Sequence, residues 1–507
     1  MLIIELWINI FKYVDIRSGL NITSCCKKTI NTNCFGNFLA SRSLITCIDS
    51  IYGDKITPNI LVDTKYINLT DLNIDNNNFL TNLPYFPFLT KLSICGEKCK
   101  INNSSLRGLN LTQLNMGNNV NITQIYFLTS LKKLNIKKCH QIRQECLDNL
   151  DLVDLNIKNN CNIYILTKMT NLKILNASGK SCCIDQLCIQ DLNLTKLNIA
   201  GNQSVTDISH MTGLKILNVS GSCIISQQMI NYLNLEKLYV NYNLKITNLS
   251  HMTKLRVLYA HESGIDQNGI NGLNLNILKI CGCDEINDVS WMSNLKKLDV
   301  SNNCGVDQNG INGLDLISLD AYGNQGIYNV SWMTSLTYLN AGGFCTIGQE
   351  GIQKLRLTKL EMNSNHYIHN ISHITTLKEL HAKCIKNFSN NSLCGLSLTY
   401  LDISNNHQVT NFKQMTTLTH LNISSIYMND NVYDLSGLNL VKLNITNRGL
   451  MRDISYLSSL RVLTALGCCN LTIKSLSKMH LLIFNTSLSG RKLLLLPNIT
   501  QINYNSY

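Results

Sequence analysis

The feature that most constrains this chain is a short pattern, L-x-x-L-x-Φ, in which Φ is an apolar or small residue. It occurs three times between residues 194 and 240, beginning at Leu194, Leu214 and Leu235. Steps alternate between 20 and mostly 21 or 22 residues, so the complete unit is a pair of 40 to 42 residues. A fixed period of this kind indicates an array of structural repeats. The second leucine of the pattern recurs at Leu72, Leu92, Leu114, Leu134, Leu155, Leu175, Leu197, Leu217, Leu238, Leu258, Leu278, Leu298, Leu319, Leu339, Leu360, Leu380, Leu401, Leu421, Leu443 and Leu463.

The spacing inside the pattern predicts a short strand in each repeat. The second leucine and Φ are two residues apart, so in a strand they point to one face while the residue between them points to the other. We expect the apolar pair to fill the interior and each strand to stack on the next, about 4.8 Å away, in a parallel sheet. Because each repeat packs only on its neighbours, all 507 residues can belong to one array.

The pattern resembles that of leucine-rich repeats. One member of each pair, as at Val205–Thr212, is similar to internalin-type repeats. The other carries glycine-rich segments, at Gly264–Leu273 and Gly305–Leu314, whose glycines suit tight turns with positive φ. The resemblance implies an α/β repeat fold with little regular helix: a curved solenoid, spanning residues 67–480 in about twenty repeats, with the parallel sheet on its concave side.

A further implication of the resemblance concerns the asparagine three residues after Φ. In leucine-rich repeats this side chain usually turns inward and bonds to the backbone of neighbouring repeats, forming a ladder. An inward amide is stable there because the buried backbone groups it meets would otherwise be unpaired. Asparagine stands at this position at Asn77, Asn119, Asn160, Asn202, Asn243, Asn303, Asn324, Asn365 and Asn406.

The residue that follows the second leucine should face solvent on the concave sheet. In the first repeats it is nearly always asparagine, which we interpret as the default of an asparagine-rich composition. From Tyr239 to Asp402 the column becomes aromatic and charged, and the residue before the leucine adds Lys297, Lys359, Glu379 and His420. Tyrosine mixed with charge is typical of binding hot spots, although drift on an exposed face is the alternative. The predicted partner-binding residues are Tyr239, Tyr259, Lys279, Asp299, Asp320, Tyr338, Glu361, His381, Tyr400 and Asp402.

Residues 1–42 read as a small helical module, because apolar residues recur at near-helical spacing. Several of its segments resemble an F-box, whose pattern runs L-P-x-E-L, then I-F-x-Y-L-D, then V-C-K-x-W. This chain has Ile3 where that family usually has proline and Thr29 where it usually has tryptophan. The segments that carry the resemblance are residues 2–6, 10–15, 18–20 and 25–28.

The resemblance implies a substrate-recognition subunit of a cullin-type ubiquitin ligase, with the repeats holding an unknown protein substrate. An irregular F-box before Asn- and Ile-rich repeats is also similar to the F-box repeat proteins of giant DNA viruses of amoebae. The alternative is a helical cap on a scaffold without a ubiquitin role. Residues 43–66 would form a connector or N-terminal cap, and 481–507 a C-terminal cap and tail. The residues implied to contact a Skp-type adaptor are Leu6, Ile10, Phe11, Val14 and Leu20.

Charge and hydropathy argue against nucleic-acid or membrane partners. The net charge is +12, spread diffusely over 44 basic and 32 acidic residues, and its densest cluster, at residues 132–138, lacks interleaved aromatics. No apolar run approaches the ~20 residues of a membrane span, and the N-terminus lacks the basic region of a signal peptide. The 21 cysteines follow no pairing pattern, so we expect buried free thiols in an intracellular protein, in the host cytoplasm if it is viral.

No catalytic constellation or cofactor motif is found in the sequence. Cys281 and Cys283 form an isolated C-x-C, which is too little for a metal site. His210, His251 and His373 occupy equivalent repeat positions, where surface packing explains them better than metal binding does. Trp291 and Trp332 likewise recur at one position and are interpreted as convex-side packing. We therefore expect a non-enzymatic binding protein without cofactor or metal.

Overall fold

The computed structural model describes residues 69–426, 433–449, 451–467, 470–487, 499 and 501–504. The F-box-like module with its adaptor-contact residues, and the connector at 43–66, lie outside the described residues. The chain divides into two compact units, Met1–Ile246 (unit 1) and Thr247–Tyr507 (unit 2). Within the described ranges, no helix is both long enough and apolar enough to span a bilayer.

Unit 1 is a stack of three-residue strands, each with a buried leucine at its centre. Neighbouring strands pair in parallel with leucine opposite leucine, as at Leu72–Leu92 and Leu134–Leu155. The interior is therefore a continuous apolar column in which every repeat covers the next. The strands are β1 Asp71–Asn73, β2 Lys91–Ser93, β3 Gln113–Asn115, β4 Lys133–Asn135, β5 Asp154–Asn156, β6 Ile174–Asn176, β7 Lys196–Asn198, β8 Ile216–Asn218 and β9 Lys237–Tyr239.

Unit 2 continues the same arrangement, and each of the twenty leucines predicted at a strand centre lies within a strand. β21 and β22 follow the last of these leucines and pair with β20 and with each other in parallel. The strands are β10 Val257–Tyr259, β11 Ile277–Lys279, β12 Lys297–Asp299, β13 Ser318–Asp320, β14 Tyr338–Asn340, β15 Lys359–Glu361, β16 Glu379–His381, β17 Tyr400–Asp402, β18 His420–Asn422, β19 Lys442–Asn444, β20 Val462–Ala465, β21 Ile483–Thr486 and β22 Gln501–Tyr504.

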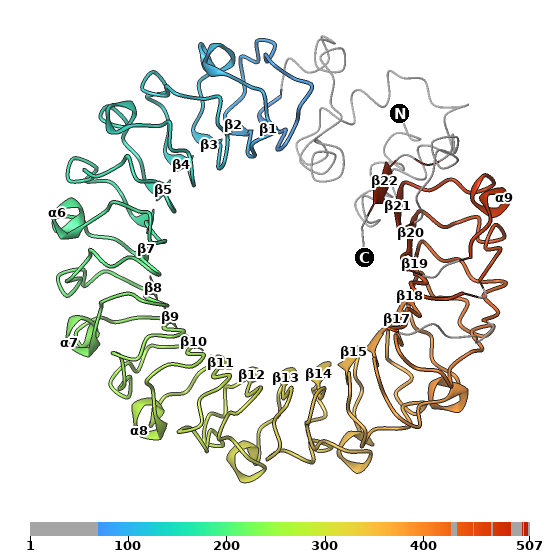
Figure 1. The fold of residues 1–507 in the computed structure, drawn as a ribbon. Helices are drawn as coiled ribbons and strands as arrows, with labels where there is room; N and C mark the ends of the chain where they lie inside the picture. The colour runs from blue at the N-terminus through green and yellow to red at the C-terminus, as the bar shows by residue number, and fades with distance from the viewer. Residues whose placement is uncertain are drawn as a thin grey trace, which may run out of the picture. The chain divides into compact units, whose positions relative to one another are not determined.

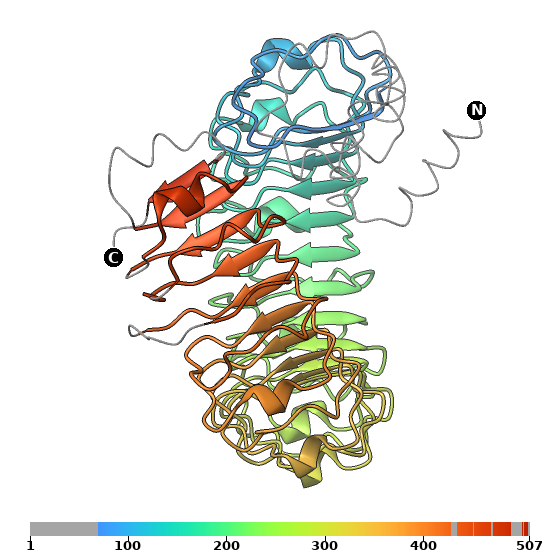
Figure 2. The ribbon, with the colours of Figure 1, turned by 90° about the vertical axis from the view of Figure 1, so that its right-hand side faces the viewer.

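Among the described residues, helices are only three or four residues long and occur in alternate repeats, which gives the paired period its structural basis. Within each unit they lie on the outer side, while the strands line the inner, concave side (Figure 1). Figure 2 shows strands of unit 1 as arrows stacked one above another. The helices are η3 Asn103–Leu106, η4 Gln144–Cys146, α6 Gln186–Ile189, α7 Gln227–Ile230, α8 Gln267–Ile270, η5 Asn309–Ile311, η6 Glu350–Ile352, η7 Asn390–Leu393 and α9 Ile473–Leu476.

The asparagine ladder predicted for the interior is present in most helix-free repeats of the described residues. Asn324 shows its bonding: the amide nitrogen donates to the carbonyls of Val300 (3.1 Å) and Val306 (3.0 Å). Its amide oxygen accepts from the backbone N–H groups of Gly326 (2.9 Å) and Ile327 (3.0 Å). Each such side chain thus satisfies buried backbone groups that the short strands leave unpaired. The buried members are Asn77, Asn119, Asn160, Asn202, Asn243, Asn324, Asn365 and Asn406.

The prediction was wrong at Asn303, which is exposed. Asn303 belongs to the helix-bearing member of the pair, whose other copies mostly carry a buried cysteine near this position, and the half-buried Cys304 follows it. At the preceding ladder position Cys283 replaces asparagine and donates its S–H to the carbonyl of Ala260 (2.9 Å). In the helix-bearing repeats, buried cysteines alternate with the ladder asparagines along much of the described interior, at Cys99, Cys139, Cys182, Cys223 and Cys345.

A second amide ladder on the outer side was not predicted. Gln308 accepts from the backbone N–H groups of Tyr328 (3.1 Å) and Asn329 (2.9 Å) and donates to the carbonyl of Asn329 (3.0 Å). In other helix-bearing repeats an asparagine or glutamine at the corresponding position bonds to the backbone of the following repeat. The members of this outer amide ladder are Asn103, Gln144, Gln186, Gln267, Gln308, Gln349 and Asn390.

The glycine-rich segments serve two purposes. Gly313 has φ +76°, as the turn interpretation requires. Gly310 instead allows close packing, because a Cβ there would sit 2.1 Å from the carbonyl oxygen of Asn287. The convex tryptophans pack as expected: the indole N–H of Trp291 donates to Leu273, and that of Trp332 donates to Leu314, both at 3.0 Å.

Candidate partner-binding face of unit 2

The asparagines that follow the central leucines in unit 1 have a structural role that the sequence interpretation missed. We call this position the post-leucine column, and the residue before the leucine the pre-leucine column. In unit 1 the amide oxygen of the post-leucine asparagine accepts from the backbone N–H two residues on. Asn135, Asn156 and Asn198 each make this bond at 3.1 Å. The asparagine therefore caps the strand end, a local bond that Asn and Asp make readily.

Unit 2 keeps this cap at some positions and gives it up at others. Asp320 accepts from the Tyr322 N–H at 3.1 Å, and Asp402 accepts from that of Ser404 at 2.9 Å. Other positions carry side chains that cannot reproduce an Asn cap, because a lysine has no acceptor and a tyrosine hydroxyl lies too far from its own backbone. From β10 to β17, the positions at which Asn or Asp is replaced are Tyr259, Lys279, Glu361 and His381.

Parallel pairing places the predicted residues of unit 2 side by side. In the post-leucine column, Tyr259 is opposite Lys279, which is opposite Asp299. In the pre-leucine column, Tyr338 begins a run that continues through β15 and β16 to Tyr400 in β17. Neighbouring side chains along such a column start about 4.8 Å apart. The predicted residues from Tyr259 to Asp402 therefore share one face of unit 2.

Tyr239, the remaining predicted residue, lies in β9 of unit 1. The amine of Lys237 lies 5.0 Å from the centroid of its ring, within cation–π range. In its column Tyr239 follows Asn218 of β8. It is the first residue of the post-leucine column to depart from the small polar residues of the preceding strands.

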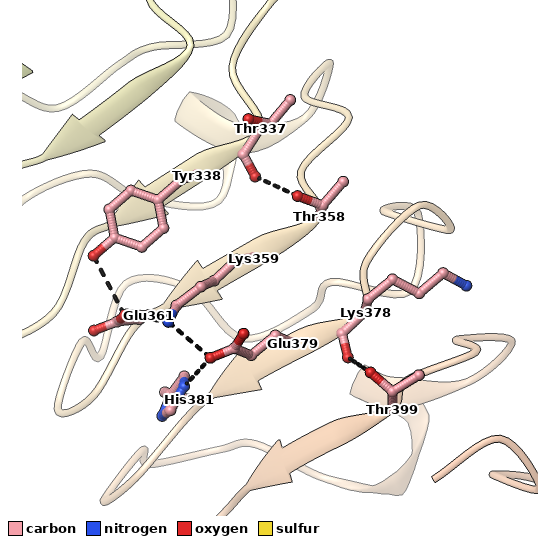
Figure 3. Close-up of polar contacts among 9 residues, drawn as sticks. All are labelled: Thr337, Tyr338, Thr358, Lys359, Glu361, Lys378, Glu379, His381 and Thr399. Atoms are coloured by element: carbon pink, nitrogen blue, oxygen red, sulfur yellow. Dashed lines mark hydrogen bonds and ion pairs between the residues drawn. The ribbon is translucent and has the colours of Figure 1, made fainter. Parts of the chain in front are cut away.

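Lys359 is the centre of a charged network on this face (Figure 3). Its amine lies 2.7 Å from a carboxylate oxygen of Glu379 and 3.1 Å from one of Glu361. His381 shares the same Glu379 oxygen at 2.8 Å, and the Tyr338 hydroxyl lies 3.3 Å from Glu361. One ammonium group thus joins three adjacent strands, β14 to β16, through two carboxylates.

The pKa shifts in this network follow from its contacts. Burial opposes the charged form of Lys359, but hydrogen bonds to Glu379 and Glu361 outweigh it and raise the pKa of the amine. Burial likewise acts to raise the pKa of Glu379, but hydrogen bonds to Lys359 and His381 lower it on balance. Both partners are therefore held in their charged forms at neutral pH.

An aromatic stack continues from the network toward the C-terminus. The ring of Tyr400 lies 4.7 Å, centroid to centroid, from His381 and 6.1 Å from His420, and it is tilted by 32° and 27° to them. Beside it, Asp402 accepts from the side-chain amide of Asn422 at 2.9 Å. The stack offers ring surface next to hydrogen-bonding groups, which suits a polypeptide partner.

The other end of this face carries both signs of charge, with Lys279 and Lys297 on the strands beside Asp299 and Asp320. Lys279 lies 3.8 Å from Asp299 and 5.6 Å from the ring centroid of Tyr259. Burial, with the negative charges of Asp299 and Glu361, raises the pKa of Asp320. Burial and the negative charges of Asp320 and Glu361 also raise the pKa of Tyr338. The face therefore combines aromatic rings, donors, acceptors and both signs of charge.

Nothing in the described part of the chain groups three or more His, Cys, Asp or Glu side chains for a metal ion. The three histidines at equivalent repeat positions lie at the surface, and the ring nitrogen of His373 is 3.3 Å from the carbonyl oxygen of Ile352. Of the two cysteines of the C-x-C motif, Cys281 and Cys283, the second is buried. The arrangement on the concave face of unit 2 is suited to recognition.

Comparisons with known proteins were made for both sequence and structure. No protein-family model matches the chain, and no curated protein matches its sequence. Among solved structures, the mouse RP105/MD-1 complex is 16% identical over 86% of this chain and 82% of that chain, with a TM-score of 0.42. The TLR13–ssRNA13 complex is 17% identical over 87% of this chain and 76% of that chain, with a TM-score of 0.41.

A third similar structure is the leucine-rich-repeat ectodomain of the receptor kinase GASSHO1/SCHENGEN3 from Arabidopsis thaliana, in complex with CASPARIAN STRIP INTEGRITY FACTOR 2. It is 16% identical over 87% of this chain and 68% of that chain, with a TM-score of 0.40. The chain is a leucine-rich-repeat solenoid. That assignment stands on its own parallel register and buried leucines, and similarities at these identities and TM-scores say nothing of its function.

Proposed function

We propose that the chain is a non-enzymatic scaffold that binds a protein partner on the concave face of unit 2, between Tyr259 and His420. The supporting observation is the post-leucine column, where strand-capping asparagines give way to Tyr, Lys, Glu and His. Random substitution on an exposed surface does not favour the loss of a stabilising cap, so the replacement of the cap by tyrosines and linked charges indicates selection for another role. Tyrosine and charged side chains packed together are what protein-binding hot spots use.

Restoring asparagine at four positions tests this proposal. Asparagine is the residue that unit 1 carries in the same column, so the variant keeps the strand-end geometry while losing the binding groups. We expect it to fold normally and to lose the partner, with at least about tenfold weaker affinity, as expected when hot-spot residues are removed. The substitutions of this asparagine variant are Tyr259→Asn, Lys279→Asn, Glu361→Asn and His381→Asn.

A matched control changes the same column in unit 1 to serine, whose hydroxyl makes a similar local bond. Partners are captured from cell lysate by chemical cross-linking, identified by mass spectrometry, and their affinity is measured with purified chains. Equal affinity for the asparagine variant and the unaltered chain would contradict the proposal. The control substitutions are Asn135→Ser, Asn156→Ser, Asn176→Ser and Asn198→Ser.

The F-box resemblance extends the proposal to a ubiquitin-ligase role. Residues 1–42 would dock a Skp-type adaptor of a cullin ligase while the repeats hold the protein to be modified, in the cytoplasm of a host cell if the chain is viral. The support is the sequence of this segment alone. On this proposal the chain does no chemistry itself, and it raises the effective concentration of substrate near the transferring enzyme.

Replacing two apolar residues of the segment tests this extension. We expect the unaltered chain to capture Skp-type adaptor and cullin in a pull-down, and the variant that combines Leu6→Asp and Phe11→Asp to capture neither. Binding of the concave-face partner should persist, because the repeats are unchanged. If neither chain captures adaptor or cullin while both retain the partner, the chain is a scaffold without a ubiquitin role.

A further inference from the structure

Two tryptophans of unit 2 pack at a recurring junction on the outer side, between a helix-bearing repeat and the helix-free repeat after it. The indole N–H of Trp291 donates to the carbonyl of Leu273, and that of Trp332 donates to the carbonyl of Leu314. Both side chains are half-buried. In each case the indole therefore lies across the junction and hydrogen-bonds to the preceding repeat.

The junction between the repeats of β4 and β5 in unit 1 has the same layout without the tryptophan. Leu150 follows the short helix η4, as Leu273 follows α8. Lys168 comes 18 residues after Leu150, as Trp291 does after Leu273. The Lys168 side chain is exposed, and no residue in the described ranges donates a hydrogen bond to the Leu150 carbonyl. The acceptor of the indole bond is thus present, while its donor is missing.

A pocket lies at this junction. We call the outer pocket the cavity of about 240 Å³ between residues 144–150 and 164–169. Leu150 and Lys168 both line it, so it includes the position that an indole takes in unit 2. The buried side chain of Leu147 contributes an apolar wall. The outer pocket therefore combines an apolar surface with a backbone acceptor.

Ile165, which lines the outer pocket, departs from a pattern of the outer side. In the other helix-free repeats from β1 to β19 the corresponding residue is Asn, Asp or Gln. Asp288 and Asn329 show its role, because each accepts from the backbone N–H two residues on, at 2.8 and 2.9 Å. Ile165 cannot make this bond and is 43% exposed, and Tyr164 beside it is 50% exposed. A polar cap has thus been replaced by exposed apolar surface at the same junction that lacks a tryptophan. The residues of the pattern are Asn82, Gln124, Asp207, Asn248, Asp288, Asn329, Asn370, Asn411 and Asp453.

An indole suits the outer pocket better than other groups do. It combines an apolar ring with one N–H donor, and unit 2 shows that it fits a junction of this layout. The carboxylates of Glu145 and Asp148 line the pocket together with the amine of Lys168, so a neutral donor is accommodated more readily than an acidic side chain. A free indole compound would leave Tyr164 and Ile165 exposed, whereas neighbouring residues of a polypeptide would cover both.

We infer that the outer pocket binds a tryptophan side chain of a second protein. Its indole N–H donates to the Leu150 carbonyl, and an apolar residue next to the tryptophan covers Ile165. A buried aromatic anchor in a pocket is the usual centre of a protein interface. The outer pocket belongs to unit 1, so this inference goes beyond the proposed function and does not depend on it.

Short peptides test the inference without knowledge of the partner. Five-residue peptides with Trp, Phe or Ala between isoleucine and serine are titrated with the full chain, and ligand-observed NMR gives their dissociation constants. We expect the Trp peptide to bind about fivefold more tightly than the Phe peptide, because only indole donates to the Leu150 carbonyl. The Ala peptide should bind most weakly. Equal affinities of the Trp and Phe peptides would contradict the inference.

Two substitutions locate the binding. Lys168→Trp supplies an indole from the chain itself, as Trp291 does in unit 2, and should weaken binding of the Trp peptide at least about tenfold. Ile165→Asp restores the polar residue of the other repeats and should weaken binding about threefold. The matched control is Lys180→Trp, at an exposed lysine of unit 1 outside the pocket. Thermal unfolding confirms that each variant is folded.

The outcomes distinguish the possible occupants. Unchanged affinity in Lys168→Trp, or an equal loss in Lys180→Trp, refutes the outer pocket as the site. The chain's remaining tryptophan, Trp7, is the competing occupant. If the Trp peptide binds only to a Trp7→Phe variant, the pocket holds this chain's own side chain and the assignment to a second protein is wrong. Equal binding by that variant and the unaltered chain supports the assignment.

The asparagine variant separates this inference from the proposed function. Its four substitutions all lie in unit 2, so it should bind the Trp peptide as tightly as the unaltered chain does. Loss of the concave-face partner with the peptide affinity unchanged supports both sites independently. If the asparagine variant keeps its partner and Lys168→Trp loses the peptide, the proposed function fails and the outer pocket stands.

Discussion

The concave faces of unit 1 and unit 2 are built on the same three-residue strands but present different side chains. From β1 to β8 the post-leucine residue is asparagine in every strand except β2, where it is Ser93. From β10 to β17 it is Tyr, Lys, Asp, Asp, Asn, Glu, His and Asp in turn. The scaffold is constant, so the difference between the columns separates what the fold needs from what recognition needs. In unit 1 the post-leucine residues cap the strand ends and so stabilise the fold.

The largest expected effect should be the same in both units, because the inner asparagine ladder is common to them. Asn160→Ala in unit 1 and Asn324→Ala in unit 2 each leave buried backbone groups without a partner. We expect each to lower the free energy of unfolding by about 3 kcal/mol, measured by urea titration. A much smaller loss in one unit would show that the two interiors also differ.

A smaller effect should distinguish the post-leucine columns. Asn156→Ala removes a strand-end cap in unit 1 and should cost about 1 kcal/mol of stability. His381→Asn in unit 2 introduces the residue that makes this cap elsewhere, and should leave stability within about 0.5 kcal/mol of the unaltered chain. Thermal unfolding of both variants checks this. Equal destabilisation would mean that His381 already supports the strand end as well as asparagine does.

The smallest effect concerns pH. Burial and neighbouring carboxylates raise the folded-state pKa of Asp320 above its unfolded value of 3.8, so its ionised form is disfavoured in the folded chain. Its ionisation therefore lowers stability at pH 7, and this penalty vanishes as pH falls below 3.8. We expect Asp320→Asn to stabilise the chain at pH 7 by at most about 1 kcal/mol.

The control for this prediction is the same substitution examined at low pH. There the carboxyl is neutral in both states, so Asp320→Asn and the unaltered chain should unfold at the same denaturant concentration. Glu379 behaves oppositely: its lowered pKa means that its contribution is present above 4.5 and lost as pH falls through the folded value. A stabilisation by Asp320→Asn that persisted at low pH would contradict the electrostatic explanation.

Much of the fold follows from the sequence because alternation within L-x-x-L-x-Φ directly fixes which side chains point inward. The strand centres at Leu72 through Leu463 were predicted on that basis. The inward asparagines were predicted from the resemblance to leucine-rich repeats, and among them only Asn303 was wrong. It failed because spacing alone does not say whether amide or thiol turns inward in a given member of the pair. The structure places the predicted partner-binding residues of unit 2 on one face, and their role in binding remains a prediction.

Two kinds of feature could not be predicted from the sequence: contacts between residues about twenty positions apart in the chain, and roles of residue types that are frequent throughout it. Asparagine is so frequent in this chain that a capping role at Asn135 was indistinguishable from background. The outer bond from Gln308 to Asn329 and the sharing of Lys359 between two glutamates depend on which side chains the register brings together. The periodic Gln in the D-Q-N-G segments was the sequence signal that could have predicted the outer bond of Gln308.

The outer amide ladder has a consequence for how such a chain can change in length. Gln267 and Gln308, in successive helix-bearing repeats, each tie that repeat to its helix-free successor. Deleting one repeat of about twenty residues would join two members of the same kind and leave a glutamine facing a segment of the wrong shape. Deleting or duplicating a whole pair preserves the alternation of helix-bearing and helix-free repeats on which this ladder depends. The pair is therefore the unit by which the array can be lengthened or shortened with its outer ladder intact.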